Sequence, residues 1–194
     1  MSDSLIFLIV VAVLAVILVG WAIAIYNKLV RLKTMKEEGW SGVDVQLKRR
    51  RDLVGNLVNA VKGYMTHERG VLEEVVKYRS ISQSATGVGA APAVAGVAAA
   101  EGLLSQSLGR LFAVMENYPD LKANTNVLQL QNDLSLLEDE IQKARRYYNG
   151  AVRDLNILIR SFPSNIIAGW YKFVVAEFFE LENVADREAP VVNL

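Results

Sequence analysis

With 194 residues, of which 52% are hydrophobic and 22% charged, the chain has the size and composition of one globular domain. Its 21 basic and 21 acidic side chains balance, so no overall field attracts nucleic acid, and we expect no nucleic-acid partner. The lack of cysteine excludes disulfides and thiol nucleophiles, and a single histidine, His67, excludes His–His metal ligation, so we expect no enzyme activity, cofactor or metal site.

The N-terminal part of the chain reads as a membrane anchor. A short tail, residues 1–4, precedes an uncharged apolar segment at residues 5–25. As a helix this segment is about 31 Å long, which matches a hydrocarbon core of about 30 Å. The tail carries an acid where a cleaved signal peptide carries a base, and the apolar run is too long for such a signal. We predict a permanent transmembrane helix; a buried core helix is the alternative.

Charged residues beside this segment predict its orientation. Four basic residues follow the span, and none precedes it: Lys28, Arg31, Lys33 and Lys36. The positive-inside rule then places the N-terminus outside and the remainder of the chain in the cytoplasm.

A heptad pattern follows, in which apolar residues recur at alternating spacings of three and four. Only Arg50 and Glu68 interrupt the series, which comprises Trp40, Val43, Leu47, Arg50, Val54, Leu57, Val61, Tyr64, Glu68, Val71, Val75 and Tyr78. This period is typical of a helix that packs along one face. We predict one long helix at about residues 38–82, which can continue directly from the anchor.

The basic sequence KRRR, residues 48–51, lies within this pattern, which assigns Arg50 to the core. Lys48 is four residues from both Asp44 and Asp52, a spacing that pairs charges on a helix surface. A buried Arg50 needs an acidic partner, because an unpaired buried charge is costly. Candidates on the facing helix are Asp133, Glu138, Asp139 and Glu140. We predict a structural charge network of Asp44, Lys48, Arg50 and Asp52; contact with anionic lipid is the alternative.

The middle of the chain contains a run of small residues. Ser80–Ala100 is rich in Gly, Ala and Ser, which predicts a loop, with the next helix starting near Pro92. That helix stops at residues 117–120, and Asn124 or Thr125 can cap the one that follows.

A second heptad series runs without interruption through the following helix. Its members are Val127, Leu130, Leu134, Leu137, Ile141, Ala144, Tyr148, Ala151, Leu155, Leu158 and Phe162. Pro163 ends the helix, because it disfavours helical geometry at Phe162. At about 1.5 Å per residue both patterned helices reach about 55–60 Å. We predict an all-α protein, in which the anchor carries an elongated antiparallel helical bundle at residues 26–183, with a C-terminal tail at 184–194.

The C-terminal segment is dense in aromatic residues. They are Trp170, Tyr171, Phe173, Phe178 and Phe179. These residues can cover the end of the bundle, contact another subunit or lie on lipid, and aromatic clusters are favoured at the centres of protein interfaces. We take them as candidate oligomer contacts and expect a homo-oligomer, a ring or cage on the membrane. Four asparagines can form a polar layer between helices: Asn56, Asn59, Asn149 and Asn156.

Several motifs together resemble the LemA family of bacterial membrane proteins. They are YNKLV after the anchor, WSGVDVQLKRRRDLVGNLVNAVKGYMTHE from Trp40, LFAVMENYPDLKAN, ARRYYNGAVRDLN and SFPSNIIA. The resemblance extends from Tyr26 to Phe179 in the same order. Gly55 departs from it, since the family commonly has proline there, and should loosen the helix slightly without changing its path.

The resemblance implies one N-terminal membrane helix with a helical bundle, in the inner membrane of a bacterium. It also implies a relationship to magnetosome-associated proteins and a tendency to be encoded near HtpX-type membrane metalloproteases, and it implies no catalytic residue or cofactor. We therefore expect a non-enzymatic scaffold or adaptor that self-assembles and organises partner membrane proteins. The alternative is a sensor or binding module that recognises a small anionic ligand or lipid headgroup in its bundle.

Overall fold

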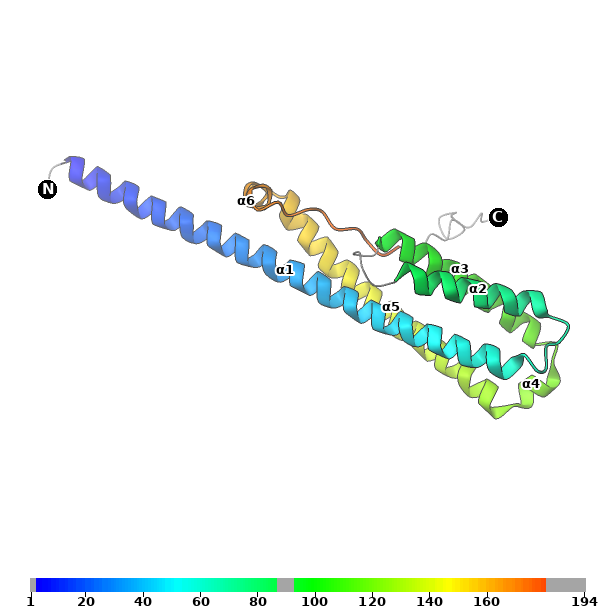
Figure 1. The fold of residues 1–194 in the computed structure, drawn as a ribbon. Helices are drawn as coiled ribbons and strands as arrows, with labels where there is room; N and C mark the ends of the chain where they lie inside the picture. Colours follow the sequence, from blue (N-terminus) through cyan, green and yellow to red (C-terminus); the bar gives the residue numbers. More distant parts are fainter. Residues whose placement is uncertain (1–2, 87–92, 181–194) are drawn as a thin grey trace, which may run out of the picture.

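The computed structural model describes residues 3–86 and 93–180, and this part of the chain is helical and contains no strand. The all-α prediction is confirmed. The helices, shown in Figure 1, are α1 (Asp3–Val61), α2 (Arg69–Ala85), α3 (Val94–Met115), α4 (Pro119–Ala123), α5 (Thr125–Arg160) and α6 (Ser164–Trp170).

The anchor and the first helix of the bundle are one continuous helix. α1 has 59 residues and is therefore about 88 Å long. Its N-terminal part projects beyond the other helices (Figure 1), and all its residues from Asp3 to Trp21 are exposed. The helix is long and apolar enough to cross a membrane. The bundle is thus joined to the apolar segment by helix alone.

The bundle consists of two antiparallel helix pairs. The C-terminal half of α1 packs along α5, and α2 packs along α3, with the second pair lying beside the first (Figure 1). One core cluster draws buried side chains from all four helices, among them Val54, Val75, Leu104 and Leu134. This arrangement matches the predicted elongated antiparallel bundle.

The prediction of a single helix over residues 38–82 is wrong. The chain turns between Val61 and Arg69, and α2 folds back along the bundle. Met65 is fully buried in this turn, whereas Tyr64, the residue expected in the core, is exposed. Folding back brings the apolar face of α2 to the same core as α1, where a continuous helix would have left that face in water.

The predicted loop at residues 80–100 is also too long. α2 extends to Ala85 and α3 begins at Val94, so most of this segment is helical, and Pro92 lies outside the described residues. Ser82, Ala98 and Ala100 are buried. The small side chains therefore serve the packing of α2 and α3 as well as the connection between them.

The second heptad pattern describes α5 well. Its members from Val127 to Leu158 are buried or half-buried, but Phe162 lies beyond the end of the helix and is 80% exposed. The cap prediction is confirmed at Asn124, whose side-chain oxygen accepts hydrogen bonds from the backbone N–H groups of Asn126 and Val127. α5 is therefore fixed at both ends, by this cap and by the turn into α6.

Candidate functional site

A buried charge at the centre of the bundle connects three helices. Arg50 of α1 is 7% exposed, and its guanidinium lies 3.3 Å from the carboxylate of Glu101 in α3. The same guanidinium lies 3.1 Å from the carboxylate of Glu138 in α5 and donates a 2.9 Å hydrogen bond to the hydroxyl of Ser105. Glu101 is 1% exposed. Both charges are thus removed from water and satisfied by each other and by neighbouring polar groups.

A second arginine extends this network to α2. Arg51, also buried, donates a 3.4 Å hydrogen bond to the Ser82 hydroxyl, which in turn donates to Glu101. Arg79 of α2 donates a 2.7 Å hydrogen bond to the backbone carbonyl of Arg51. Gly55 leaves room for Arg79, since a Cβ there would lie 3.1 Å from the guanidinium. All four long helices therefore meet at one polar level.

The structure buries one of the predicted charge-network residues and leaves two others exposed. Arg50 is in the core, and Glu138 was one of its four candidate partners. The predicted surface pairs are wrong: among the described residues no ion pair involves Asp44, Lys48 or Asp52. Lys48 and Asp52 are exposed, and in water such a pair gains too little to hold two flexible side chains together.

The main partner of Arg50, Glu101, was missed in the sequence. It lies in α3, in a region assigned partly to a loop, rather than on the expected facing helix. One signal was present, because Glu101 is the only acid between Glu74 and Glu116 and is surrounded by apolar residues. A lone acid of this kind in an amphipathic helix is a candidate for a buried partner.

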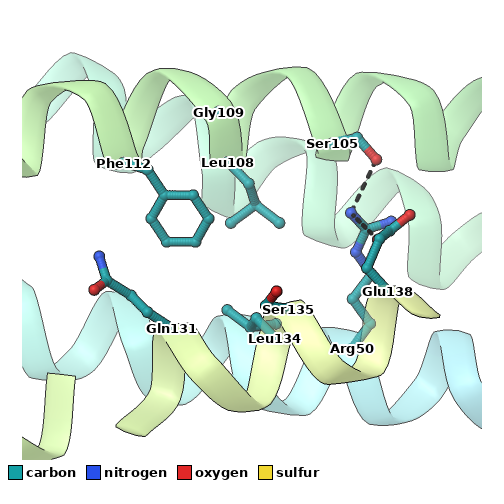
Figure 2. Close-up of a pocket in the computed structure, with 9 residues that line it drawn as sticks. All are labelled: Arg50, Ser105, Leu108, Gly109, Phe112, Gln131, Leu134, Ser135 and Glu138. Atoms are coloured by element: carbon teal, nitrogen blue, oxygen red, sulfur yellow. Dashed lines mark hydrogen bonds and ion pairs between the residues drawn. The ribbon is translucent and has the colours of Figure 1, made fainter. Parts of the chain in front are cut away.

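An open groove begins beside Arg50, between α3 and α5. It has a volume of about 530 Å³ and is lined by Arg50, Ser105, Leu108, Gly109, Phe112, Gln131, Leu134, Ser135 and Glu138. Figure 2 shows Leu108 and Phe112 of α3 facing Gln131 and Leu134 of α5, with the charged group at one end. The groove can therefore hold an elongated apolar group that carries a polar or charged end.

Arg145 adds to the charge near this level. Burial lowers the pKa of its guanidinium, the nearby Glu138 carboxylate raises it, and the positive charge of Arg50 lowers it further. The guanidinium lies 5.1 Å from the centre of the Phe179 ring, a distance at which a cation is attracted to an aromatic face.

The aromatic C-terminal residues do not form one surface. Phe179 is 1% exposed and packs against Trp40 and Tyr148, so it is a core residue and cannot be an oligomer contact. Phe173 is half-buried against Tyr26. Trp170, Tyr171 and Phe178 are exposed. Burial of Phe179 follows from the path of residues 171–180, which return along the bundle after α6 (Figure 1).

Two asparagines of α5 hold this returning segment. Asn156 exchanges two hydrogen bonds of 2.8 Å with the backbone of Ala176. Asn149 makes the equivalent pair with the backbone of Phe179, at 3.0 and 2.8 Å. Asn149 and Asn156, which were expected in a polar layer between helices, thus bind an extended segment. Their side chains pair with backbone groups that an extended segment outside a sheet cannot pair by itself.

The described residues contain no group of three or more His, Cys, Asp or Glu side chains that could hold a metal ion. His67, the single histidine, is exposed in the turn between α1 and α2. The groove contains two serines, Ser105 and Ser135, and no histidine among its lining residues. These lining residues do not include the serine–histidine pair that activates a serine nucleophile in hydrolases.

The chain matches a family model and several known proteins in sequence. A family model described as the LemA family matches residues 39–194. The chain is 27% identical over 210 residues to the magnetosome protein MamQ 2 of Paramagnetospirillum magneticum, covering 96% of this chain and 75% of that protein. It is 28% identical over 167 residues to the protein LemA of Metamycoplasma hominis, covering 86% and 70% of the two chains.

We predict that removal of the Arg50 charge strongly destabilises the bundle. Arg50→Leu should lower the free energy of unfolding by about 3–5 kcal/mol, because Glu101 is left buried and unpaired. Arg50→Ala should cost more, since it also leaves a cavity. The exposed neighbour provides a matched control, and Arg49→Leu should change stability by less than about 0.5 kcal/mol. Denaturant unfolding in mild detergent measures all three; equal stability of the Arg50 and Arg49 variants would contradict the buried network.

Proposed function

The chain belongs to the LemA family, and we propose that it acts as a membrane-anchored, non-enzymatic scaffold or adaptor that self-assembles and organises partner membrane proteins. The observation that carries this proposal is the continuity of α1 from Asp3 to Val61. A continuous helix is much stiffer than a flexible linker, which would let the bundle move freely. The bundle is therefore held at a set height beside the membrane, as a scaffold requires.

The groove between α3 and α5 is the proposed docking site for the partner. Its apolar walls, Leu108, Phe112 and Leu134, suit a partner's apolar side chains, and Arg50 with Glu138 suits a polar group at the end of the same segment. The partner we propose is a membrane protein, because the bundle is confined near the bilayer. An HtpX-type membrane metalloprotease is the first partner to test, since the family resemblance implies a tendency to be encoded near such proteases.

A second function is favoured by one specific observation, the position of Arg50 at the end of the groove. A guanidinium at the mouth of an apolar groove suits a small anionic amphiphile or a lipid headgroup. In this alternative the chain is a sensor or binding module, and its bundle binds the ligand where the adaptor would bind a protein.

Self-assembly is proposed to involve the transmembrane segment. Ala12, Ala15 and Gly20 are small and exposed there, and a Cβ added at Gly20 would meet no atom within 4 Å. Small residues allow helices in lipid to approach closely. Ala22 is less available, because it is half-buried by the bundle. Identical chains that associate in this way can close into the proposed ring or cage.

We predict that a photoreactive phenylalanine derivative at position 112 cross-links a membrane protein in cells. Phe112 lines the groove and is half-buried, so the derivative replaces a similar ring. The same derivative at the exposed Tyr64, outside the groove, is the control. Mass spectrometry of the product decides between the functions: a specific protein supports the adaptor, and a lipid or small anion supports the binding module. Equal products at both positions would contradict a role for the groove.

We predict a defined homo-oligomer in native mass spectrometry of the full chain from mild detergent. Gly20→Leu should shift the population towards monomer, because a leucine prevents close helix approach, whereas Val19→Leu should not, since valine is already large. Monomers of the wild type in several detergents and in nanodiscs would rule out self-assembly.

We propose that the bundle lies in the cytoplasm and the N-terminus outside the inner membrane. The basic residues after the span, Lys28 and Arg31 foremost, support this orientation. A reporter fused after Leu194 should then show cytoplasmic activity, such as the fluorescence of a green fluorescent protein. Activity of alkaline phosphatase at the same position, which requires export, would reverse the orientation.

A further inference from the structure

α6 lies beside the end of the apolar anchor segment. Ile167 and Ala168 of α6 form a buried cluster with Leu29 of α1 and Leu155 of α5. Ala22 and Ile25, which both belong to the apolar segment at residues 5–25, pack against this cluster. Ala22 is about 4.5 Å of helix rise before Ile25. If residues 5–25 cross the bilayer, α6 is therefore at the depth where the hydrocarbon ends.

The opposite side of α6 and the turn before it carry exposed apolar residues. Phe162, in the turn from α5, is 80% exposed, and Ile166 and Trp170 of α6 are 45% and 75% exposed. Ile166 and Trp170 are four residues apart, a spacing that places them on the same side of the helix. The α6 segment therefore has one face covered by protein, through Ile167 and Ala168, and one apolar face that nothing in the described chain covers.

The charges near this face are positive. Residues 155–176 contain no acid and two bases, Arg160 and Lys172, which are exposed on either side of α6. Lys172 has φ of 55°, in the left-handed region, at a position where helices usually end with glycine. The backbone N–H of Phe173 bonds to the carbonyl of Ala168, which closes this helix end. Lys172 therefore occupies a backbone position at which glycine would avoid about 1–2 kcal/mol of conformational strain.

We propose that α6 is a second membrane contact, in which Phe162, Ile166 and Trp170 enter the interface of the leaflet from which α1 emerges. Arg160 and Lys172 then face anionic headgroups, as do basic residues beside interfacial helices in general. Tryptophan suits this depth, since its ring is apolar and its N–H can remain hydrated. The occupant follows from position: α6 packs beside Ala22 and Ile25 of the apolar segment, so its exposed apolar residues lie next to the part of the chain that enters lipid in the proposed function.

This second contact has a mechanical consequence. A single transmembrane helix can tilt and rotate in the bilayer. A second point of attachment on a rigidly packed neighbour restricts both motions, because Ile167 and Ala168 fix α6 to α1 and α5. The proposal rests on the membrane anchor of the proposed function, and it holds whether the groove binds a protein or a ligand.

The three tryptophans of the full chain allow a direct test in lipid vesicles. Replacing two of them with phenylalanine leaves Trp21, Trp40 or Trp170 as the single fluorophore, and position 170 stays apolar and aromatic in each variant. The vesicles contain phosphatidylcholine and phosphatidylglycerol, with acyl chains brominated either near the headgroup end or near the methyl end. Trp40 is the matched control, since it is half-buried and about 22 Å of helix rise beyond Ile25.

Trp170 should lose most of its emission to bromine near the headgroup end and less to bromine near the methyl end, while Trp40 keeps its emission. Phe162→Ser with Ile166→Ser should reduce the quenching of Trp170, and Leu128→Ser with Leu136→Ser, on the exposed surface of α5, should not. Unquenched but blue-shifted Trp170 would indicate a subunit contact and overturn the proposal. If Trp21 also escapes quenching, the anchor itself does not insert, and both proposals fall.

Discussion

The burial of Arg50 is the constraint on which the arrangement of the helices depends. Its guanidinium and the carboxylate of Glu101 are both removed from water, and an unpaired charge in that position would cost several kcal/mol. Arg50 also reaches Glu138, and Ser82 joins Glu101 to Arg51. Apolar helix faces alone allow one helix to shift by a turn along another with little loss of stability. The directional contacts of Arg50, Glu101 and Ser82 instead favour one alignment of α1, α2, α3 and α5. We propose that this polar level sets the register of the bundle.

Because α1 is continuous, the bundle and the apolar segment have a fixed relationship. The same helix supplies Arg50 to the bundle centre and Ala22 and Ile25 to the cluster that holds α6. The groove opens at Arg50, so its distance from the apolar segment is fixed by the helix rise between these residues. The returning segment, held by Asn149 and Asn156, closes the remaining side near Trp40. Anchor, groove and α6 are parts of one connected body.

The sequence was sufficient for the elements that depend on local patterns. The apolar span, both heptad series, the cap at Asn124 and the burial of Arg50 all follow from spacing and residue type. The turn at residues 62–68 could not be predicted in this way, because the heptad spacing continues through it. A hairpin of two amphipathic helices gives the same sequence pattern as one long helix. Glu101 was missed, and Phe179 was predicted as a candidate oligomer contact, for a different reason. Their partners are far away in the sequence, and Phe179 lies in an extended segment without the hydrophobic periodicity of a helix.

The central claim, that Arg50 and Glu101 form a coupled buried pair that aligns the helices, is tested most directly by a double-mutant cycle. The free energies of unfolding of wild type, Arg50→Leu, Glu101→Leu and the double variant are measured in one detergent. We expect the double variant to lose less stability than the sum of the single losses, with a coupling of about 0.5–3 kcal/mol, because the second substitution removes the charge that the first leaves unpaired. Additive losses would contradict the claim, since they would show that the two charges do not act on each other.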